Sequence, residues 1–354
     1  MKALAVNFGF DERVLDHLAP LCFGFAIPFL VTSEENFSLL KKYYPMVNAI
    51  YLPPDEVNYS ALINEYDLFL QSTFWREDSL LQLLAKERKK KVQFLYVPHG
   101  NSDKGYIAPM MQQILNQELL FLYGPHMMHR LKKQSFWHSS LKYLFCGNYR
   151  YLFYKKHKAF YDPLVEKEIF HKLDKRKKNL LYAPTWNDQE ESTSYYAIAE
   201  KLTPLAEQYN ILFKPHPMLI EQDPARYFAC LSLFQKNVFV LENFPLIYPL
   251  LNRIDIYLGD FSSIGYDFLT FQRPMFFYPP EDRRKTSCAL YDCGIKMQKE
   301  DLKNLQGFFE KHLALDRSAI QKERYLYSFG KEKSFEELYN ALIALRSLPK
   351  AAAK

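Results

Sequence analysis

The chain alternates short, continuously apolar segments with amphipathic ones, and this alternation constrains the fold more than any other feature of the sequence. In the first half the apolar segments are 2–7, 26–31, 66–71, 92–98, 119–123 and 141–146, and the helix-like segments are 12–22, 34–44 and 78–88. Strands that bury both faces are apolar throughout, whereas half-exposed strands alternate apolar and polar residues. The pattern therefore predicts a parallel sheet with helices on both faces.

The alternation stops at a polar cluster and then restarts. A basic helix-like run over 151–173 ends in a charged cluster at 174–178 that has no apolar periodicity. Beyond the cluster, strands are predicted at 179–183, 210–214, 238–241, 254–259 and 274–278. A chain of 354 residues is longer than one hydrophobic core usually organises. We therefore expect an α/β domain over 1–172, a second over 173–330, and a C-terminal helix with a disordered tail over 331–354.

Composition restricts the class of protein. With 48% hydrophobic residues, 24% charged residues and only 11 glycines, the chain resembles a globular protein that buries a large core. The five cysteines are scattered without metal-ligand spacing, which favours a reducing cytoplasm. The N-terminus has the pattern of a first strand rather than of an export signal. The longest apolar run, 18–31, contains two prolines and is too short to span a membrane, so we expect no spanning segment.

Basic residues concentrate in one stretch. The net charge of the chain is +6, yet residues 130–178 hold 14 Lys or Arg against 4 Asp or Glu, and many aromatic residues lie among them. A solvated helical surface, an anionic membrane surface and an anionic polymer are all compatible with this pattern. No nucleic-acid-binding motif is present, so nucleic acid is not an expected partner. The stretch from Arg130 to Lys178 is therefore a candidate surface for an anionic membrane.

The segment Asp260-Phe-Ser262-Ser263, with Asp267 four residues further on, lies between two predicted strands. Hydroxyls and unpaired backbone N–H groups at a helix N-terminus just past a buried strand favour phosphate. Asp and Ser are also the preferred N-cap residues, so an ordinary helix cap is the alternative interpretation. Other polar motifs at strand ends favour the phosphate site.

One such motif follows the predicted strand 92–98 and contains His99, Gly100, Asp103 and Lys104. Glycine lets the backbone approach a ligand closely, and histidine is the side chain of this loop that titrates near neutral pH. A lone histidine is more often structural than catalytic. The neighbouring carboxylate and ammonium groups favour a catalytic role for His99.

Two more strand ends carry polar groups. Lys214 ends one predicted strand, and His216 follows between two prolines, which hold the backbone extended and lower the entropy of presenting the imidazole. Thr185 follows another strand, where its hydroxyl suits a phosphate and a plain turn is the alternative. The sequence contains no Asp-x-Asp or His-x-His cluster that demands a divalent ion, so we predict that no metal is needed.

Taken together, these motifs resemble the ordered motif series of the CDP-glycerol glycerophosphotransferase family, the teichoic-acid polymerases and primases. The residues that carry the resemblance are His99-Gly100 with Lys104, Gly147-Asn-Tyr-Arg150, Leu181-Tyr-Ala-Pro-Thr185-Trp, Lys214-Pro-His216-Pro217, Asp260-Phe-Ser262-Ser263, Asp267-Phe and Arg273-Pro274. Several motifs in the same order are more specific than any one of them.

The resemblance implies a GT-B-like α/β fold, with two Rossmann-like domains facing each other across a cleft and C-terminal helices. It implies transfer of a polyol phosphate, glycerol phosphate foremost, from a CDP-linked donor to a hydroxyl of a cell-envelope glycan or lipid-linked acceptor, with release of CMP. No cofactor is expected, because the nucleotide-activated donor is itself a substrate. The implied location is cytoplasmic, peripherally bound to the inner face of the cell membrane.

By matching motifs, the resemblance also implies roles for individual residues. His99 would be the base, and His216 would bind or protonate the phosphate region. Lys214 and the helix N-terminus at Ser262 and Ser263 would neutralise the pyrophosphate. The implied substrate ligands are Gly100, Asp103, Lys104, Thr185, Lys214, Asp260, Ser262, Ser263 and Asp267.

The chain also departs from the family pattern. The loop after His99-Gly100 continues Asn-Ser-Asp-Lys rather than Thr-Pro-x-Lys, which leaves the acceptor open. Little sequence lies outside the two predicted domains, which favours a single transfer over processive polymerisation. The alternatives are another GT-B sugar-nucleotide enzyme, either a glycosyltransferase or a 2-epimerase, and an inactive GT-B scaffold that docks to membrane. An epimerase would be expected to carry more acidic residues at its sugar site.

Overall fold

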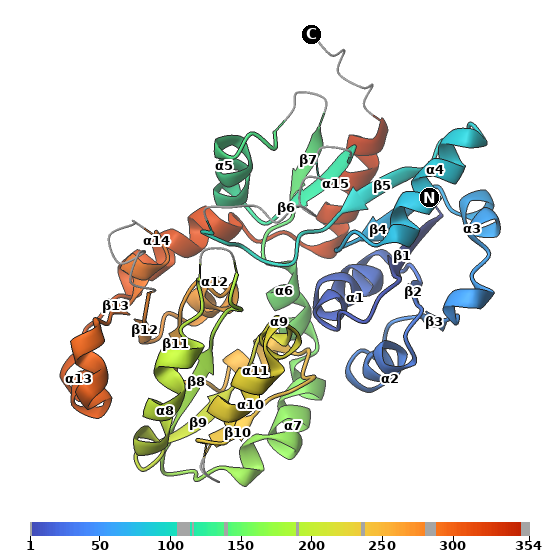
Figure 1. Cartoon of the computed structure of the whole chain (residues 1–354). Coiled ribbons are helices and arrows are strands. Elements are labelled where there is room, and N and C mark those ends of the chain that lie inside the picture. The colour runs from blue at the N-terminus through green and yellow to red at the C-terminus, as the bar shows by residue number, and fades with distance from the viewer. Residues whose placement is uncertain are drawn as a thin grey trace. The chain divides into compact units, whose positions relative to one another are not determined.

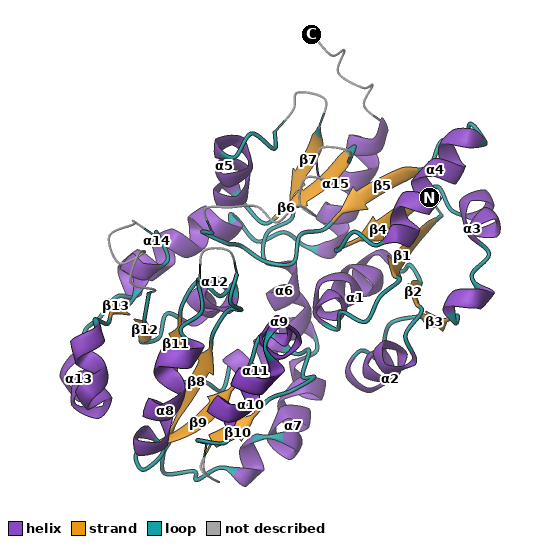
Figure 2. Ribbon diagram, in the orientation of Figure 1, coloured by secondary structure: helices purple, strands orange, loops and turns teal. Residues whose placement is uncertain are grey.

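The computed structural model describes residues 2–104, 114, 117–137, 141–188, 191–234, 238–279 and 288–347. The chain forms two compact units, coloured by residue number in Figure 1. Unit 1 consists of Met1–Asn101, Ile107–Lys156 and Ser328–Lys354, and unit 2 consists of Ser102–Tyr106 and His157–Tyr327. Each unit is built around one sheet, shown in orange in Figure 2.

Among the described residues of unit 1, seven strands form a sheet in the order β3-β2-β1-β4-β5-β6-β7. The strands are β1 (Ala3–Asn7), β2 (Phe29–Val31), β3 (Ala49–Tyr51), β4 (Leu68–Gln71), β5 (Gln93–Tyr96), β6 (Leu119–Leu122) and β7 (Lys142–Phe145). The strand pairs are parallel, and Leu4 of β1 lies opposite Phe69 of β4 in the central register. The sheet order reverses direction at β1 and β4, the position where parallel α/β sheets commonly bind ligands.

Helices cover both faces of this sheet. They are α1 (Arg13–Phe25), α2 (Glu34–Tyr43), α3 (Tyr59–Glu65), α4 (Arg76–Glu87), α5 (Pro125–Lys133), α6 (Tyr149–Lys156) and α15 (Phe335–Ser347). On one face, Ile63 of α3 and Leu81 of α4 join a core with Leu4 and Phe69. On the other face, Phe25 of α1 packs against both Phe121 of β6 and Tyr339 of α15. Helix α15 therefore packs in the same core as α1, although the two helices lie near opposite ends of the sequence. Figure 1 shows the red α15 beside the green β7.

Within the described part of unit 2, six parallel strands are arranged in the order β10-β9-β8-β11-β12-β13. The strands are β8 (Lys178–Ala183), β9 (Tyr209–Phe213), β10 (Val238–Val240), β11 (Ile256–Gly259), β12 (Met275–Phe277) and β13 (Ile295–Lys296). The helices are α7 (Lys158–Glu168), α8 (Tyr195–Leu205), α9 (Pro217–Gln222), α10 (Pro224–Leu231), α11 (Ile247–Leu251), α12 (Ile264–Phe268), α13 (Leu305–His312) and α14 (Ser318–Phe329), the last of which runs into unit 1.

The core of unit 2 is rich in aromatic rings. Tyr195 of α8 stacks on Phe213 of β9 with the ring centroids 5.3 Å apart, and Phe309 of α13 stacks on Phe276 of β12 at 4.2 Å. On the opposite face, Tyr257 of β11 stacks on Phe268 of α12 at 5.5 Å. Both faces are thus covered, as the continuously apolar strands predict.

The structure confirms the α/β class and differs from the sequence predictions in detail. The predicted boundary at 172/173 differs from the division into units, which falls between Lys156 and His157. The predicted separate segment 331–354 belongs to unit 1. The predicted helical run 151–173 is two helices, α6 and α7, that meet at His157. The predicted disordered tail, 349–354, lies outside the described residues.

Candidate functional site

In unit 1, loops from neighbouring strands meet at the carboxyl edge of the sheet. β1, β4 and β5 are adjacent, and the loops that follow them carry Asp11, Ser72 and His99. His99 Nδ1 lies 3.3 Å from the carbonyl oxygen of Ser72. A carbonyl oxygen only accepts hydrogen bonds, so Nδ1 carries the proton and Nε2 of the neutral imidazole is the acceptor. Nε2 is therefore the nitrogen that can take a proton from a substrate.

A carboxylate lies near this imidazole. Asp11 accepts two bonds from Arg13, at 2.8 Å from Nε to Oδ1 and at 2.9 Å from Nη2 to Oδ2. Burial alone would raise the pKa of Asp11, but Arg13 and His99 together hold that pKa below its ordinary value. Asp11 is therefore charged at neutral pH, and it favours a positive charge on His99 once that residue has taken a proton.

A second histidine, His17 of α1, lies beside His99. The two rings meet edge to face with their centroids 6.3 Å apart. Burial lowers the pKa of His17 well below its ordinary value, and the positive charges of Arg150, of Arg13 and of His99 in its protonated form lower it further. His17 is therefore neutral at neutral pH. No sequence pattern singled out His17, because it lies within an amphipathic helix-like segment rather than at a strand end.

The Gly147-Asn-Tyr-Arg150 element of unit 1 anchors α6 on α1. Gly147 has a φ of +66°, and a Cβ atom there would lie 3.1 Å from the carbonyl oxygen of Lys331. Arg150 Nε donates to Asp16 Oδ2 at 2.8 Å, and the hydroxyl of Tyr44 donates to Asp16 Oδ1 at 2.9 Å. Arg150 and Asp16 are both buried. The element therefore serves the packing of unit 1.

The loop that begins with His99 passes from unit 1 into unit 2. Gly100 has a φ of +115°, in the region that favours glycine, and it turns the chain directly after the histidine. Asn101 belongs to unit 1 and Ser102 to unit 2. The predicted site residues of this one loop are therefore divided: His99 and Gly100 lie in one unit, and the two charged residues lie in the other.

Asp103 is bound by protein groups of unit 2. Its Oδ2 atom accepts bonds from the hydroxyl of Tyr266 at 2.5 Å, from Sγ of Cys288 at 3.0 Å and from the backbone N–H of Leu290 at 3.3 Å. These three hydrogen bonds from protein groups are enough to account for a carboxylate at this position, without a substrate. The contact of Asp103 with substrate stays a prediction.

Lys104 joins a polar cluster at the carboxyl edge of the second sheet. Its Nζ atom lies 2.8 Å from Thr185 Oγ1 and 2.8 Å from Asp188 Oδ2, and it lies 5.2 Å from the centroid of the Trp186 ring. Thr185, Trp186 and Asp188 all follow β8. The structure thus brings Lys104 and Thr185, two of the predicted substrate ligands, into contact with each other and brings Lys104 into contact with Asp188. Their contact with substrate stays a prediction.

Asp260 binds two residues of the loop that follows β8. Its Oδ1 accepts from the backbone N–H of Thr185 at 2.7 Å, and its Oδ2 accepts from both the N–H and the hydroxyl of Ser194, at 2.7 and 2.8 Å. The side chain is fully buried, which raises its pKa to about 6 against the lowering effect of these bonds. Asp260 therefore ties the loops after β8 and β11 together. It does not cap α12, so the helix-cap alternative does not explain it.

Ser262 and Ser263 follow Asp260 directly. Ser263 occupies the N-cap position of α12, yet within the described residues its side chain makes no capping bond. Ser262 is buried and Ser263 is partly exposed. Asp267, the other predicted acidic ligand of this segment, is buried and accepts a hydrogen bond from the hydroxyl of Tyr248 at 2.9 Å. The geometry thus gives Asp267 a structural partner, and the side chain of Ser262 interacts with the hydroxyl of Tyr257. Contact of Ser262 and Ser263 with phosphate stays a prediction.

Lys214 and His216 follow β9, which neighbours β8. Lys214 Nζ donates to the carbonyl oxygen of Phe244 at 2.8 Å. His216 caps α9, because its Nδ1 accepts the backbone N–H of Met218 at 3.2 Å. Nδ1 is then the unprotonated nitrogen, so the neutral imidazole carries its proton on Nε2. The His216 ring lies 6.2 Å from the Trp186 ring, which places it beside the Lys104 cluster.

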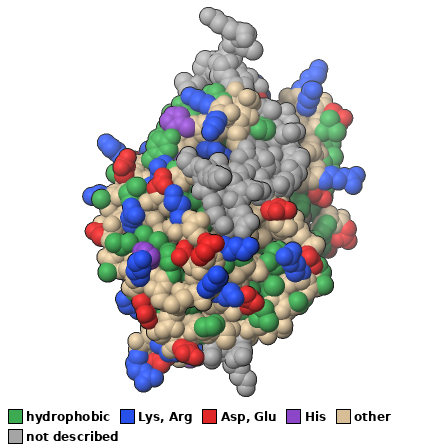
Figure 3. Space-filling view, turned by 60° about the vertical axis from the view of Figure 1, so that its left-hand side comes forward, with side chains coloured by type: hydrophobic (Ala, Val, Ile, Leu, Met, Phe, Trp, Pro, Cys, Tyr) green, Lys and Arg blue, Asp and Glu red, His purple; other side chains and the backbone are tan. Residues whose placement is uncertain are grey.

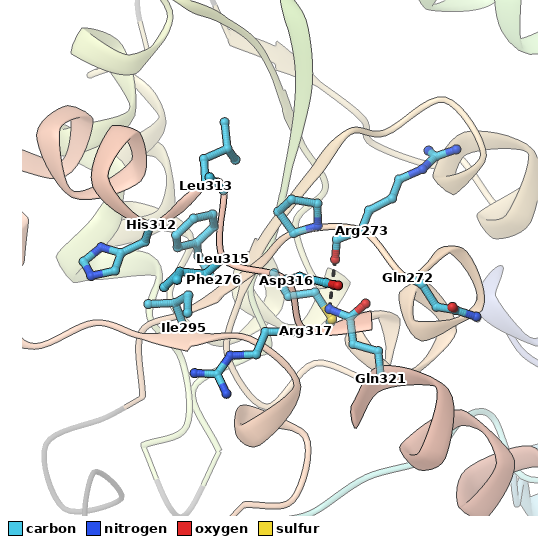
Figure 4. Close-up of a pocket in the computed structure, with 13 residues that line it drawn as sticks. Gln272, Arg273, Phe276, Ile295, His312, Leu313, Leu315, Asp316, Arg317 and Gln321 are labelled. Carbon is cyan, nitrogen blue, oxygen red and sulfur yellow. Dashed lines mark hydrogen bonds between the residues drawn. The ribbon is translucent and has the colours of Figure 1, made fainter. Parts of the chain in front are cut away.

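Two further features of the chain concern ligand binding, its possible metal ligands and one cavity of unit 2. No group of three or more His, Cys, Asp or Glu in the described part of the chain is arranged to hold a metal ion, and independence from metal stays a prediction. Unit 2 contains a cavity of about 140 Å³ that is lined by Arg273, Phe276 and Leu313 among others (Figure 4). Gln321 donates there to the carbonyl oxygen of Arg273 at 3.0 Å. Arg273 precedes β12, so the cavity includes the amino end of that strand, whereas the candidate site residues follow strands.

Comparison with known proteins assigns the family. Residues 37–286 match the family described as CDP-Glycerol:Poly(glycerophosphate) glycerophosphotransferase. The chain belongs to this family. It is 27% identical over 169 residues to the teichoic acid glycerol-phosphate primase of Bacillus subtilis, a match that covers 47% of this chain and 40% of the primase. It is 30% identical over 115 residues to the teichoic acid ribitol-phosphate polymerase TarL of Staphylococcus aureus, covering 29% of this chain and 19% of that protein. The matches thus span less than half of each relative.

Solved structures support the fold. The wall teichoic acid polymerase TagF aligns with a TM-score of 0.65 and 14% identity over 97% of this chain and 88% of that chain. A UDP-GlcNAc 2-epimerase from Neisseria meningitidis aligns with a TM-score of 0.59 and 14% identity over 98% of this chain and 99% of that chain. This member of the glycerophosphotransferase family therefore has the GT-B-like α/β fold that polymerases and epimerases share.

Proposed function

We propose that this chain transfers a polyol phosphate, glycerol phosphate foremost, from a CDP-linked donor to an acceptor hydroxyl and releases CMP. Family membership supports the reaction class. One observation supports the mechanism: the two candidate histidines hold opposite tautomers. The hydrogen bond at Nδ1 leaves Nε2 of His99 as a proton acceptor, and the cap at Nδ1 leaves Nε2 of His216 as a proton donor.

The proposed step needs both properties. The acceptor hydroxyl gives its proton to His99 Nε2 as its oxygen bonds to the phosphorus of the glycerol phosphate. The bond from that phosphorus to the bridging oxygen breaks, and the bridging oxygen leaves with CMP. His216 Nε2–H donates to the phosphate oxygens where negative charge increases. Lys214, Thr185 and the hydroxyls of Ser262 and Ser263 are the proposed further ligands of the donor pyrophosphate.

A panel of donors tests the proposal. The purified chain is incubated with CDP-glycerol, CDP-ribitol and UDP-N-acetylglucosamine together with lipid-linked disaccharide acceptors, and released CMP or UDP is measured. We expect acceptor-dependent CMP release, which is lost in His99→Asn. The full-length likeness to a UDP-GlcNAc 2-epimerase supports the alternative. Epimerisation of UDP-N-acetylglucosamine without CMP release from either CDP donor would establish that alternative instead.

We also propose that the chain binds an anionic membrane peripherally, through part of the stretch from Arg130 to Lys178. No helix within the described residues is long and apolar enough to span a bilayer. On the face drawn in Figure 3, basic side chains are interspersed with acidic and hydrophobic ones. Some basic residues are paired, such as Lys155 with Glu332 at 2.6 Å. The end of α5 is the better candidate, because Lys132 and Lys133 are exposed there.

Vesicle sedimentation tests the membrane proposal. Replacing Lys132 and Lys133 by Glu should weaken binding to phosphatidylglycerol vesicles, since each basic residue near such a surface contributes ~1 kcal/mol. Lys86→Glu with Lys91→Glu is the charge-matched control, because both residues are exposed and lie outside the basic stretch. Equal losses in the two double variants would indicate a nonspecific effect of net charge and contradict the proposed surface.

A further inference from the structure

His17 is a buried imidazole that the proposed reaction does not use. It lies on α1 with only 5% of its surface exposed, and its ring meets the His99 ring edge to face at 6.3 Å. Its Nδ1 atom lies 2.6 Å from the hydroxyl of Tyr123, which follows β6. A polar ring in an apolar interior costs free energy unless its nitrogens are satisfied. This ring is held by a short hydrogen bond beside the candidate base.

The tautomer of His17 follows from the hydroxyls around it. Tyr149 donates its hydroxyl proton to the backbone carbonyl of His17 at 3.0 Å, so its oxygen can only accept from Tyr123. The two hydroxyl oxygens are 3.5 Å apart, which is long for such a bond. Tyr123 therefore donates to His17 Nδ1 at 2.6 Å. His17 then carries its proton on Nε2, the opposite tautomer to that of His99.

The surroundings keep His17 in this neutral form and in this place. Tyr123 and Tyr149 stack with their ring planes 1° from parallel, which fixes the hydroxyl that binds His17. The Arg150 guanidinium is bound to Asp16, the residue next to His17 in the chain, and its charge disfavours a second positive charge here. His17 therefore presents a rigid, neutral ring to His99 and does not compete for the proton that His99 takes.

We propose that His17 is a positioning residue for His99. Its ring holds the His99 imidazole in the orientation in which Nδ1 donates to the Ser72 carbonyl and Nε2 is the nitrogen that acts as the base. The catalytic consequence of this role rests on the proposed function. The positioning itself concerns the tautomer of His99, and it is observable without any substrate.

Two variants separate positioning from packing. Tyr123→Phe removes the hydroxyl that holds His17 and keeps every ring, and His17→Phe keeps a ring beside His99 but removes the hydrogen bond. Tyr195→Phe is the matched control, because it removes a buried tyrosine hydroxyl that donates to a backbone carbonyl at 3.0 Å in the core of unit 2. Thermal unfolding and circular dichroism establish which variants fold.

Nitrogen-15 NMR of histidine-labelled protein reports the tautomer of His99, whose signals are assigned with His99→Asn. We expect the Nδ1–H tautomer alone in the unaltered chain and in Tyr195→Phe, and a mixture of both tautomers in Tyr123→Phe and His17→Phe. If His17→Phe does not fold, Tyr123→Phe decides the outcome. An unchanged His99 tautomer in folded Tyr123→Phe would overturn the proposal.

Kinetics add the catalytic consequence. With CDP-glycerol, Tyr123→Phe should lower kcat about tenfold, because misorientation of a base by less than an ångström is costly. The KM for the donor should stay within about twofold, since the proposed donor ligands belong to unit 2. A changed tautomer with no CMP release from the unaltered chain would refute the proposed function and leave the positioning role standing. A changed tautomer with unchanged kcat would overturn the catalytic consequence.

Discussion

The candidate side chains at the strand ends differ in what they bind: the two histidines contact the backbone through one ring nitrogen, and two of the carboxylates bind several protein donors. His99 and His216 each bind the backbone through Nδ1, and both are only partly buried. Asp260 and Asp103 instead use their oxygens on protein donors. At this scale the candidate chemistry therefore rests on two imidazoles with opposite tautomers, and the carboxylates of Asp260 and Asp103 support the loops.

His216 has two roles that substitutions can separate. His216→Ala removes both the imidazole and the cap of α9, so it should abolish CMP release and cost about 1 kcal/mol of unfolding free energy. His216→Asn restores a capping acceptor without the imidazole, because Asn is among the best N-cap residues. We expect His216→Asn to be as stable as the unaltered chain and as inactive as His216→Ala, measured by urea unfolding and CMP release. Full activity in His216→Asn would show that only the cap matters.

The sequence predicts where these residues lie along the strands, but it does not predict which groups they hydrogen-bond to. Apolar runs locate strand ends, so His99, Thr185, Lys214 and Ser262 could be placed at the carboxyl edges of two sheets. The bond from Tyr266 to Asp103 joins residues 163 positions apart, and no local pattern encodes it. For the same reason Asp103 was assigned to substrate alone, and its structural partners were unforeseen.

At the scale of secondary structure, α1 and α6 are joined through a buried ion pair. Arg150 of α6 and Asp16 of α1 are 3% and 7% exposed, so neither charge has water as an alternative partner. The pair holds Asp16 in the first turn of α1, and His17 is the next residue of that helix. The Gly-x-x-Arg element is therefore connected to the candidate base through α1.

A mutant cycle tests this element. Arg150→Met leaves the Asp16 carboxylate buried without its cation, which should cost about 3–5 kcal/mol of unfolding free energy. Adding Asp16→Asn removes the isolated charge and keeps an acceptor for the Tyr44 hydroxyl, so it should recover about half of that loss. Urea unfolding measures the four members of the cycle. A cost below 1 kcal/mol for Arg150→Met, or no recovery in the double variant, would contradict the role of the pair.

Element predictions failed where the pattern is short. β3 (Ala49–Tyr51) and β13 (Ile295–Lys296) have three and two residues, too few for periodicity to show, and the sequence analysis missed both. The helical run 151–173 was predicted as continuous because basic and aromatic residues recur throughout it. The break at His157 depends on packing, since α6 belongs to unit 1 and α7 to unit 2.

At the scale of the whole molecule, the sequence predicts the number of units but not which segments belong to each unit. Two α/β units were expected from length and alternation, and two are present. The sequence could not show that residues from 328 onward return to the first unit, because an amphipathic helix does not encode which sheet it covers. Unit 1 thus needs both ends of the chain, and α15 packs against α1.

The central claim is that phosphorus is transferred between oxygens, and phosphorus-31 NMR observes this directly. With CDP-glycerol and a lipid-linked disaccharide acceptor, we predict loss of the pyrophosphate signals and matching growth of the signals of CMP and of a new phosphodiester. The same spectra of His99→Asn should show intact donor. Persistent pyrophosphate signals from both CDP-glycerol and CDP-ribitol, with conversion of UDP-N-acetylglucosamine instead, would contradict the account.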